Sequence, residues 1–198
     1  MSDKVSKFDL IISGVGGQGT ILASDIIGKT AVISGYHVRA AETHGMAQRG
    51  GSVVNHVRIG CDYGSLISIN GADFMIALEP SESVRYLKYL APGSKIIINT
   101  EPVYPVSVLS GKSSYPAISD ILNILEKDHE VIAFNATKLA VEAGNQQAMN
   151  VVMVGALSRY LPFDEKVLFE SVKSIVPPKT LDVNKKAFML GNKIMESH

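Results

Sequence analysis

The sequence predicts an α/β protein with a Rossmann-like three-layer domain, which has a mainly parallel sheet and a helical C-terminal part. Strand-like and helix-like segments alternate from Phe8 to Phe134, and glycine or proline turns separate them. From Thr137 onward the periodicity is almost entirely helical. We expect residues 1–198 to form one domain, because the chain is long enough for one substantial core but too short for two.

The first elements are a strand, a glycine turn and a helix. Phe8–Ser13 is an apolar run, Gly14–Gly19 reads Gly-Val-Gly-Gly-Gln-Gly, and Thr20–Ser34 has helical spacing. Such a turn exposes backbone N–H groups at the positive end of a helix, which suits a phosphate or carboxylate. It also fits the dinucleotide pattern G-x-G-x-x-G, and a turn needed only to pack the helix closely onto its strand is the weaker alternative.

A second strand is expected over Tyr36–Ala41, and it places Glu42 where a ribose-binding acid would lie. The loop Thr43–Gly51 follows, with a histidine, an arginine and three glycines and little apolar content. Loops of this chemistry often carry function. Ser52–Ile59 alternates irregularly and includes His56, which predicts a partly exposed strand.

The middle of the chain continues the alternation. Asp73–Leu78 is an apolar run typical of a strand buried on both faces, and Glu79-Pro80-Ser81 is a helix start signal. Three prolines and many small polar residues predict an irregular surface excursion over Thr100–Pro116. The other expected elements are a helix to about Leu90, a strand at Lys95–Asn99, a helix at about Ile118–Asp128 and a strand at Val131–Phe134.

The C-terminal part contains one unusually apolar helix, at Gln147–Tyr160. A helix that is apolar on most sides lies in a core or under a partner, and both interpretations stay open. Gly155 and Ala156 would allow another helix to approach closely. The other expected helices are Thr137–Ala143, Asp164–Ser174 and Leu181–Met195.

The glycine turn and the Thr43–Gly51 loop are expected at one edge of the sheet, because parallel strands bring their carboxyl ends together. Arg49 would add a planar donor group to the backbone N–H groups, giving an anion-binding lip, unless it only pairs with Glu42 or remains exposed. The predicted binding residues are Gly14, Gly16, Gly17, Gln18, Gly19, Glu42, Arg49, Gly50 and Gly51.

Other residues give little sign of catalysis. His44 has no activated nucleophile in its sequence context and no metal-ligand spacing with other histidines, so we predict neither a catalytic residue nor a metal site. Cys61 is the single cysteine, which excludes a disulfide or a Cys-ligated iron–sulfur cluster within this chain.

Composition and charge limit the partners and the cellular location expected for the protein. A net charge of +0 disfavours nucleic acid as a partner. With 46% hydrophobic residues, the isolated chain is expected to form a homo-oligomer or to need a covering partner. No targeting segment or membrane-spanning run is visible, which predicts a cytoplasmic protein.

The turn Gly14–Gly19 combined with Glu42–Gly51 (Glu-Thr-His-Gly-Met-Ala-Gln-Arg-Gly-Gly) resembles the gamma-type subunit of 2-oxoacid:ferredoxin oxidoreductases. The indolepyruvate type, in which this is the beta subunit, is the most similar. The resemblance continues downstream over nearly the whole chain, at Ala72-Asp73, at Asn150–Leu157, at Asn184–Phe188 and at Gly191.

The resemblance implies a subunit of a complex that oxidatively decarboxylates aryl 2-oxoacids, passes electrons to ferredoxin and transfers the acyl group to coenzyme A. It also implies that a larger partner subunit holds thiamine diphosphate, Mg and the iron–sulfur clusters, and that this chain alone binds none of them and is inactive. The glycine turn and the Arg49 loop would face the partner's active site. A free-standing NAD- or FAD-binding protein and a non-catalytic scaffold module are the alternatives.

Overall fold

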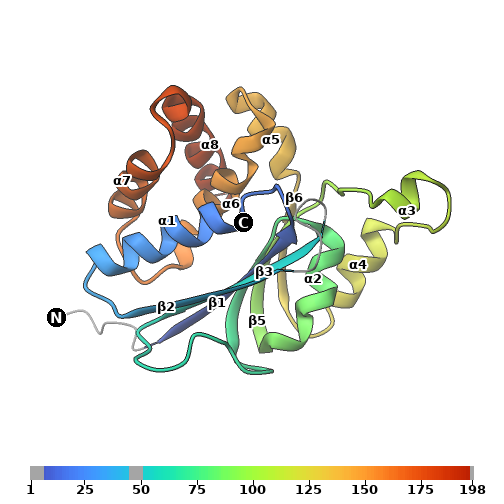
Figure 1. Cartoon of the computed structure of the whole chain (residues 1–198), viewed down its shortest axis with the longest axis horizontal. Coiled ribbons are helices and arrows are strands. Elements are labelled where there is room, and N and C mark those ends of the chain that lie inside the picture. Colours follow the sequence, from blue (N-terminus) through green and yellow to red (C-terminus); the bar gives the residue numbers. More distant parts are fainter. Residues whose placement is uncertain (1–6, 45–50, 197–198) are drawn as a thin grey trace.

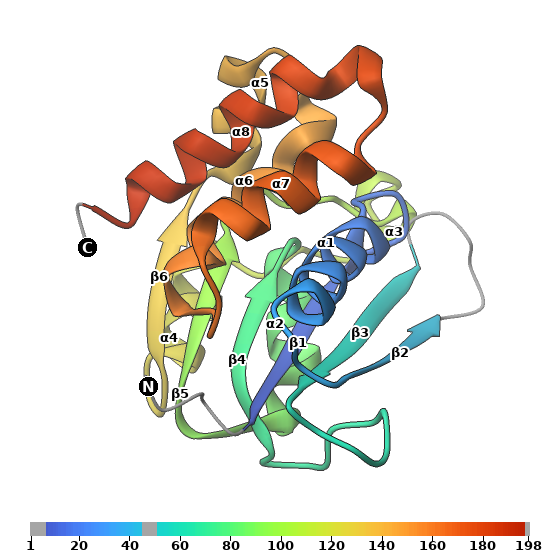
Figure 2. The same cartoon turned by 90° about the vertical axis from the view of Figure 1, so that its left-hand side faces the viewer.

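The computed structural model describes residues 7–44 and 51–196, which form a six-stranded sheet with helices on both faces (Figure 1). The strand order is β2-β3-β1-β4-β5-β6, and Figure 2 shows it from one side of the sheet to the other. The α/β class predicted from the sequence is confirmed. The strands are β1 Phe8–Val15, β2 Val38–His44, β3 Ser52–Ile59, β4 Ala72–Ala77, β5 Leu90–Asn99 and β6 Glu130–Phe134.

Two separate hydrophobic clusters fill the space between the sheet and its helices. The larger one lies under α1, α5, α6, α7 and α8, and the smaller one lies on the opposite face under α2 and α4 (Figure 1). The helices are α1 Thr20–Ile33, α2 Pro80–Tyr86, α3 Val106–Leu109, α4 Ile118–Leu125, α5 Ala136–Ala143, α6 Met149–Leu157, α7 Glu165–Ile175 and α8 Leu181–Ile194. Short 3-10 turns are η1 Leu87–Tyr89, η2 Gln146–Ala148, η3 Ser158–Tyr160 and η4 Pro178–Thr180.

Strand β3 differs from expectation. It runs antiparallel to both β1 and β2 and lies between them, whereas β1, β4, β5 and β6 pair in parallel. The prediction of a partly exposed strand at Ser52–Ile59 is wrong, because most of this strand is buried. Two of its polar side chains have partners outside the strand: His56 Nδ1 accepts the backbone N–H of Ile67 at 3.2 Å, and Arg58 Nε donates to a carboxylate oxygen of the buried Asp9 at 3.0 Å. Burial also lowers the pKa of the His56 imidazole.

The apolar helix α6 belongs to the core of this domain, which resolves the two interpretations left open by its sequence. All nine of its residues are buried, and it packs against α8. Glycines make this contact possible. A Cβ added to Gly155 would lie 2.2 Å from the Phe188 carbonyl oxygen, and one added to Gly191 would lie 1.9 Å from the Val152 carbonyl oxygen. The two helix backbones therefore touch directly.

Candidate functional site

The two predicted loops meet at the carboxyl edge of the parallel strands. The backbone N–H of Gly16 donates to the carbonyl oxygen of Gly51 at 2.8 Å. The two loops were expected to meet because they follow adjacent parallel strands, but β1 and β2 are not neighbours in the sheet. Instead β3 begins where β1 ends, with Ser52 opposite Val15, and so brings the end of the second loop to the turn. Arg49 and Gly50 lie outside the described residues.

Three glycines of the turn, Gly14, Gly17 and Gly19, are needed for different structural reasons. Gly17 and Gly19 have φ of +103° and +79°, a backbone region that side chains with a Cβ rarely adopt. Gly14 is required by packing instead, since a Cβ there would lie 3.2 Å from the Cβ of Leu78. Around Gly17 no heavy atom among the described residues lies within 4 Å of an added Cβ, so this position is open.

Gln18 holds the turn together from inside. Its side-chain Oε1 accepts the N–H of Val15 at 2.9 Å, and its Nε2 donates to the carbonyl oxygen of Leu78 at 3.0 Å. The backbone N–H of Gln18 itself donates to Val15 at 3.1 Å. The N–H groups of Gly16 and Gln18 are thus used within the protein, and the turn offers fewer free donors than its sequence indicated.

The N-terminus of α1, which follows the turn, has neither a side-chain cap nor an acidic residue to offset the positive end of its helix dipole. Gly19 is the N-cap of α1 and supplies no side-chain hydrogen bond, and the first helical turn contains no acidic residue. Asn150 from α6 supports this junction, because its Nδ2 donates to the Gly19 carbonyl oxygen at 3.3 Å. An anionic group placed here would be stabilised by the helix dipole.

Asn99, at the end of β5, is a central residue that sequence reasoning missed. Its Nδ2 donates to the Leu78 carbonyl oxygen at 3.0 Å, the same oxygen that Gln18 contacts. Its Oδ1 accepts the N–H of Ala136 at the start of α5, also at 3.0 Å. Asn99 therefore joins the ends of β4 and β5 to the start of α5. The sequence signal that could have indicated this role is that Asn99 is a polar residue directly after the apolar run 96–98.

Glu79 forms a second polar cluster beside the turn. Its carboxylate is buried and accepts the hydroxyl groups of Ser81 and Tyr115, each at 2.6 Å. It also caps α2 through the N–H of Glu82 at 3.1 Å. Burial, followed by the hydrogen bond to Glu79, raises the pKa of the Tyr115 hydroxyl well above its usual value. The sequence predicted Glu79 only as part of a helix start.

A cavity of about 320 Å³ opens between the glycine turn and the loops after β5 and α5. Glu101 is the one charged side chain among the described residues that line it, and its carboxylate accepts the Asn135 amide at 2.9 Å. An amide-rich, uncharged ligand portion fits such walls better than a phosphate does. The lining residues are Gly17, Gln18, Glu101, Pro102, Val103, Thr137, Gln146, Gln147 and Met149.

Glu42 lies away from the turn. It is half-buried in β2 and pairs across the sheet with Asn55 of β3. In a dinucleotide-binding Rossmann fold, the ribose-binding acid is on the strand next to β1. Here β3 occupies that place, so Glu42 is two strand spacings from β1, about 10 Å. This geometry disfavours a dinucleotide shared between Glu42 and the turn.

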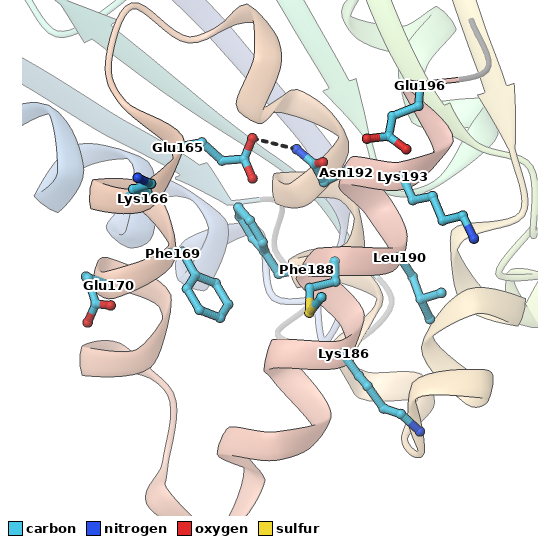
Figure 3. A pocket seen from close by; sticks show the side chains of 11 residues that line it. Glu165, Lys166, Phe169, Glu170, Lys186, Phe188, Leu190, Asn192, Lys193 and Glu196 are labelled. Atoms are coloured by element: carbon cyan, nitrogen blue, oxygen red, sulfur yellow. Dashed lines mark hydrogen bonds between the residues drawn. The ribbon is translucent and has the colours of Figure 1, made fainter.

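A larger cavity, about 720 Å³, lies between α7 and α8 (Figure 3). Its floor is apolar: the rings of Phe169 and Phe188 pack with centroids 5.3 Å apart. Figure 3 also shows Asn192 donating to Glu165, at 2.8 Å. None of the predicted binding residues that the structure describes lines this cavity.

Within residues 7–44 and 51–196, no group of three or more His, Cys, Asp and Glu side chains could hold a metal ion. The one cysteine, Cys61, has its Sγ 3.1 Å from the carbonyl oxygen of Tyr63. These residues do not fit an iron–sulfur cluster. In the same part of the chain, no helix is long and apolar enough to cross a membrane.

Comparison with known families identifies the chain. The family model described as pyruvate ferredoxin/flavodoxin oxidoreductase matches residues 9–194. The chain belongs to this family. Within the pyruvate ferredoxin/flavodoxin oxidoreductase family, one similar relative is the indolepyruvate oxidoreductase subunit IorB of Thermococcus kodakarensis, which is 43% identical over 194 residues, 96% of each chain.

Solved structures agree on the fold. The gamma subunit of a keto/oxoacid ferredoxin oxidoreductase from Geobacter sulfurreducens has a TM-score of 0.71 and 24% identity, covering 96% of this chain and 99% of that one. A 2-oxoglutarate:ferredoxin oxidoreductase from Magnetococcus marinus has a TM-score of 0.75 and 20% identity, with 98% of this chain matching 32% of that one. In the second case the fold is about a third of a longer chain.

Proposed function

We propose that the chain is a subunit of a 2-oxoacid:ferredoxin oxidoreductase of the indolepyruvate type. The complex would convert an aryl 2-oxoacid and coenzyme A into the acyl-CoA and carbon dioxide, with the electrons passing to ferredoxin. The observation that carries the proposal is the 43% identity to an indolepyruvate oxidoreductase subunit over 96% of both chains. The glycine turn joined to the second loop supports it, because these are the motifs that resemble the gamma-type subunit.

The proposal assigns thiamine diphosphate, Mg and the iron–sulfur clusters to a larger partner subunit. Those groups supply decarboxylation and electron transfer when bound. The side chains of this subunit support the assignment, since one cysteine cannot ligate a cluster and the described acidic residues form no metal-holding group. The isolated chain is then inactive, associates with itself or with its partner, and resides in the cytoplasm.

The role proposed for this chain is to complete the partner's active site at the carboxyl edge. The uncapped start of α1 provides positive potential for an anion, to which Arg49 would add a charge. The neighbouring cavity offers amide and hydroxyl groups from Thr137, Gln146 and Gln147. A molecule such as coenzyme A, which has both phosphates and amides, could contact both parts, and closing the partner's pocket is the other use of the same loops.

Purification from the native host followed by reconstitution tests the proposal. We expect a thiamine- and iron–sulfur-containing subunit to copurify with this chain. Reduction of ferredoxin or of a dye by indolepyruvate should require both subunits. Full activity of the larger subunit alone would refute the proposal, and a yellow isolated chain or one that binds NAD would favour the dinucleotide alternative.

Arg49→Ala separates the proposed role from a surface position. The assembled complex should turn over more slowly or need more coenzyme A, because the anion loses a bidentate partner. The isolated variant should melt at the same temperature as the parent chain. Unchanged kinetics would remove Arg49 from the proposed site.

A further inference from the structure

Residues 102–111, which we name the arm, form an apolar projection. Figure 1 shows α3 standing away from the sheet. The ten residues Pro-Val-Tyr-Pro-Val-Ser-Val-Leu-Ser-Gly contain no charged side chain. Val106 is 81% exposed and Leu109 72% exposed, and Val103 and Tyr104 are also exposed. Such a cluster differs from scattered apolar residues on a surface and marks an interaction site.

The arm is held in place by its contacts with the body of the protein. At its base, the N–H of Val103 donates to the buried Glu79 carboxylate at 3.3 Å. Tyr115 binds the same carboxylate, and its ring packs edge-on against Tyr104 with centroids 5.3 Å apart. The N–H of Leu109 donates to Pro105 at 3.0 Å and closes the turn at the tip. The apolar side chains are therefore presented by a preorganised backbone, which lowers the entropy cost of binding.

The arm is continuous with the candidate site. Pro102 and Val103 at its base also line the cavity next to Gly17 and Gln18. A protein that covers the arm therefore reaches the mouth of that cavity. The centre of a protein interface is depleted in charged residues, and the uncharged arm fits that composition.

We infer that the arm docks in an uncharged apolar recess of the larger catalytic subunit and thereby seats that subunit over the glycine turn. This inference rests on the proposed function. In the Magnetococcus marinus protein the same fold is joined to further protein, since the matching region is 32% of one longer chain. A second copy would instead have to accept the arm in a different surface, such as the apolar cavity between α7 and α8, and head-to-tail contacts of that kind build open chains unless they close into a ring.

Charge insertion tests the inference in the full chain. Val106→Glu and Leu109→Glu should each weaken binding to the larger subunit purified from the native host by about 30-fold or more, the effect of losing a buried anchor. The matched control is Ile69→Glu, since Ile69 is 64% exposed but lies outside the arm, in the loop before β4. The control should bind like the parent chain. Thermal melting of each isolated variant checks folding.

Hydrogen exchange gives a second measurement that needs no substitution. Peptides spanning residues 102–111 should be protected in the complex relative to the free chain. Equal binding of all variants with no protection of the arm would overturn the inference while leaving the proposed function intact. Variants that change only self-association would also overturn it, in favour of a second copy. Failure of the parent chain to bind the larger subunit would overturn the proposed function and this inference with it.

Discussion

Glycines occur at two places in this molecule for opposite reasons. Between α6 and α8, Gly155 and Gly191 are needed because the facing backbone leaves no room for a Cβ. In the turn after β1, Gly17 has open space around it and is needed only for its positive φ. The first pair serves packing inside the domain. At Gly17 a side chain would project into open space, so it would obstruct a ligand or protein that binds there.

The difference shows that a glycine pattern alone does not reveal its use. Gly14, Gly16 and Gly19 fit a dinucleotide pattern, yet a Cβ on Gly14 would meet Leu78 and the Gly16 N–H is bonded to Gly51. Gly17 lies outside the spacing of that pattern, and a Cβ added to it would meet no described heavy atom within 4 Å. Substitutions at the two places should therefore separate stability from function.

Gly191→Ala should have the largest effect. An alanine normally favours a helix by about 1 kcal/mol over glycine. Here its Cβ would meet the Val152 carbonyl oxygen, and overpacking of this kind should lower the free energy of unfolding by about 3 kcal/mol. Urea denaturation measures the change.

Gly28→Ala is the matched control for that experiment. Gly28 lies within α1, and its added Cβ would be 3.8 Å from the nearest atom, a methyl group of Val38. This substitution should raise the free energy of unfolding by up to about 1 kcal/mol. If Gly191→Ala also raised the free energy of unfolding, the result would contradict the close contact between the backbones of α6 and α8.

Gly19→Ala should rank second, because it combines both kinds of constraint. A positive φ costs an alanine about 1–2 kcal/mol. The new Cβ would also lie 2.0 Å from Asn150 Nδ2 and displace its hydrogen bond to the Gly19 carbonyl, worth about 1 kcal/mol more. In the background Asn150→Ala the clash is absent, so the added cost of Gly19→Ala should fall to the φ term alone. A cost that stays the same in both backgrounds would contradict the contact.

Gln18→Met tests the internal support of the turn. Methionine keeps the length of the side chain but leaves the N–H of the buried Val15 without its acceptor, which should cost about 1–3 kcal/mol. Thermal unfolding of the isolated chain measures this effect. Gln18→Glu is the comparison: it keeps an acceptor for Val15 but places a carboxylate oxygen against the Leu78 carbonyl oxygen, where the amide of Gln18 donates. An unchanged unfolding temperature in Gln18→Met would mean that Val15 does not depend on Gln18.

Local sequence patterns predicted most of this fold, because helices and strands express their burial in short-range periodicity. The helix expected at Thr20–Ser34 is observed at Thr20–Ile33, and the strand expected at Asp73–Leu78 is observed at Ala72–Ala77. The position of β3 could not be predicted in this way. Strand order depends on pairing between distant segments. The alternation within Ser52–Ile59 does not indicate which strands pair with it.

The candidate site was predictable only where its signal is local. The glycine turn was found, and so was its proximity to Gly51, although for a reason that the strand order corrects. Asn99 and Glu79 were missed, because each works through partners far along the chain. Glu79 binds Tyr115, 36 residues away, and Asn99 binds Ala136, 37 residues away. No spacing rule connects such residues before the sheet is assembled.

Gly17→Ala should have the smallest effect on the isolated chain and the clearest effect on function. Its φ of +103° costs an alanine about 1 kcal/mol, and no clash within the described residues adds to that. Because the position is open, the new methyl group would stand where the proposed function places a ligand or the partner subunit. Turnover of the assembled complex should fall more than the loss of stability explains, and Gly17→Val should lower it further. Steady-state kinetics with the larger subunit, set beside unfolding of the isolated chain, make the comparison. Turnover that follows stability alone would place Gly17 with Gly155 and Gly191, as a residue needed only for the fold.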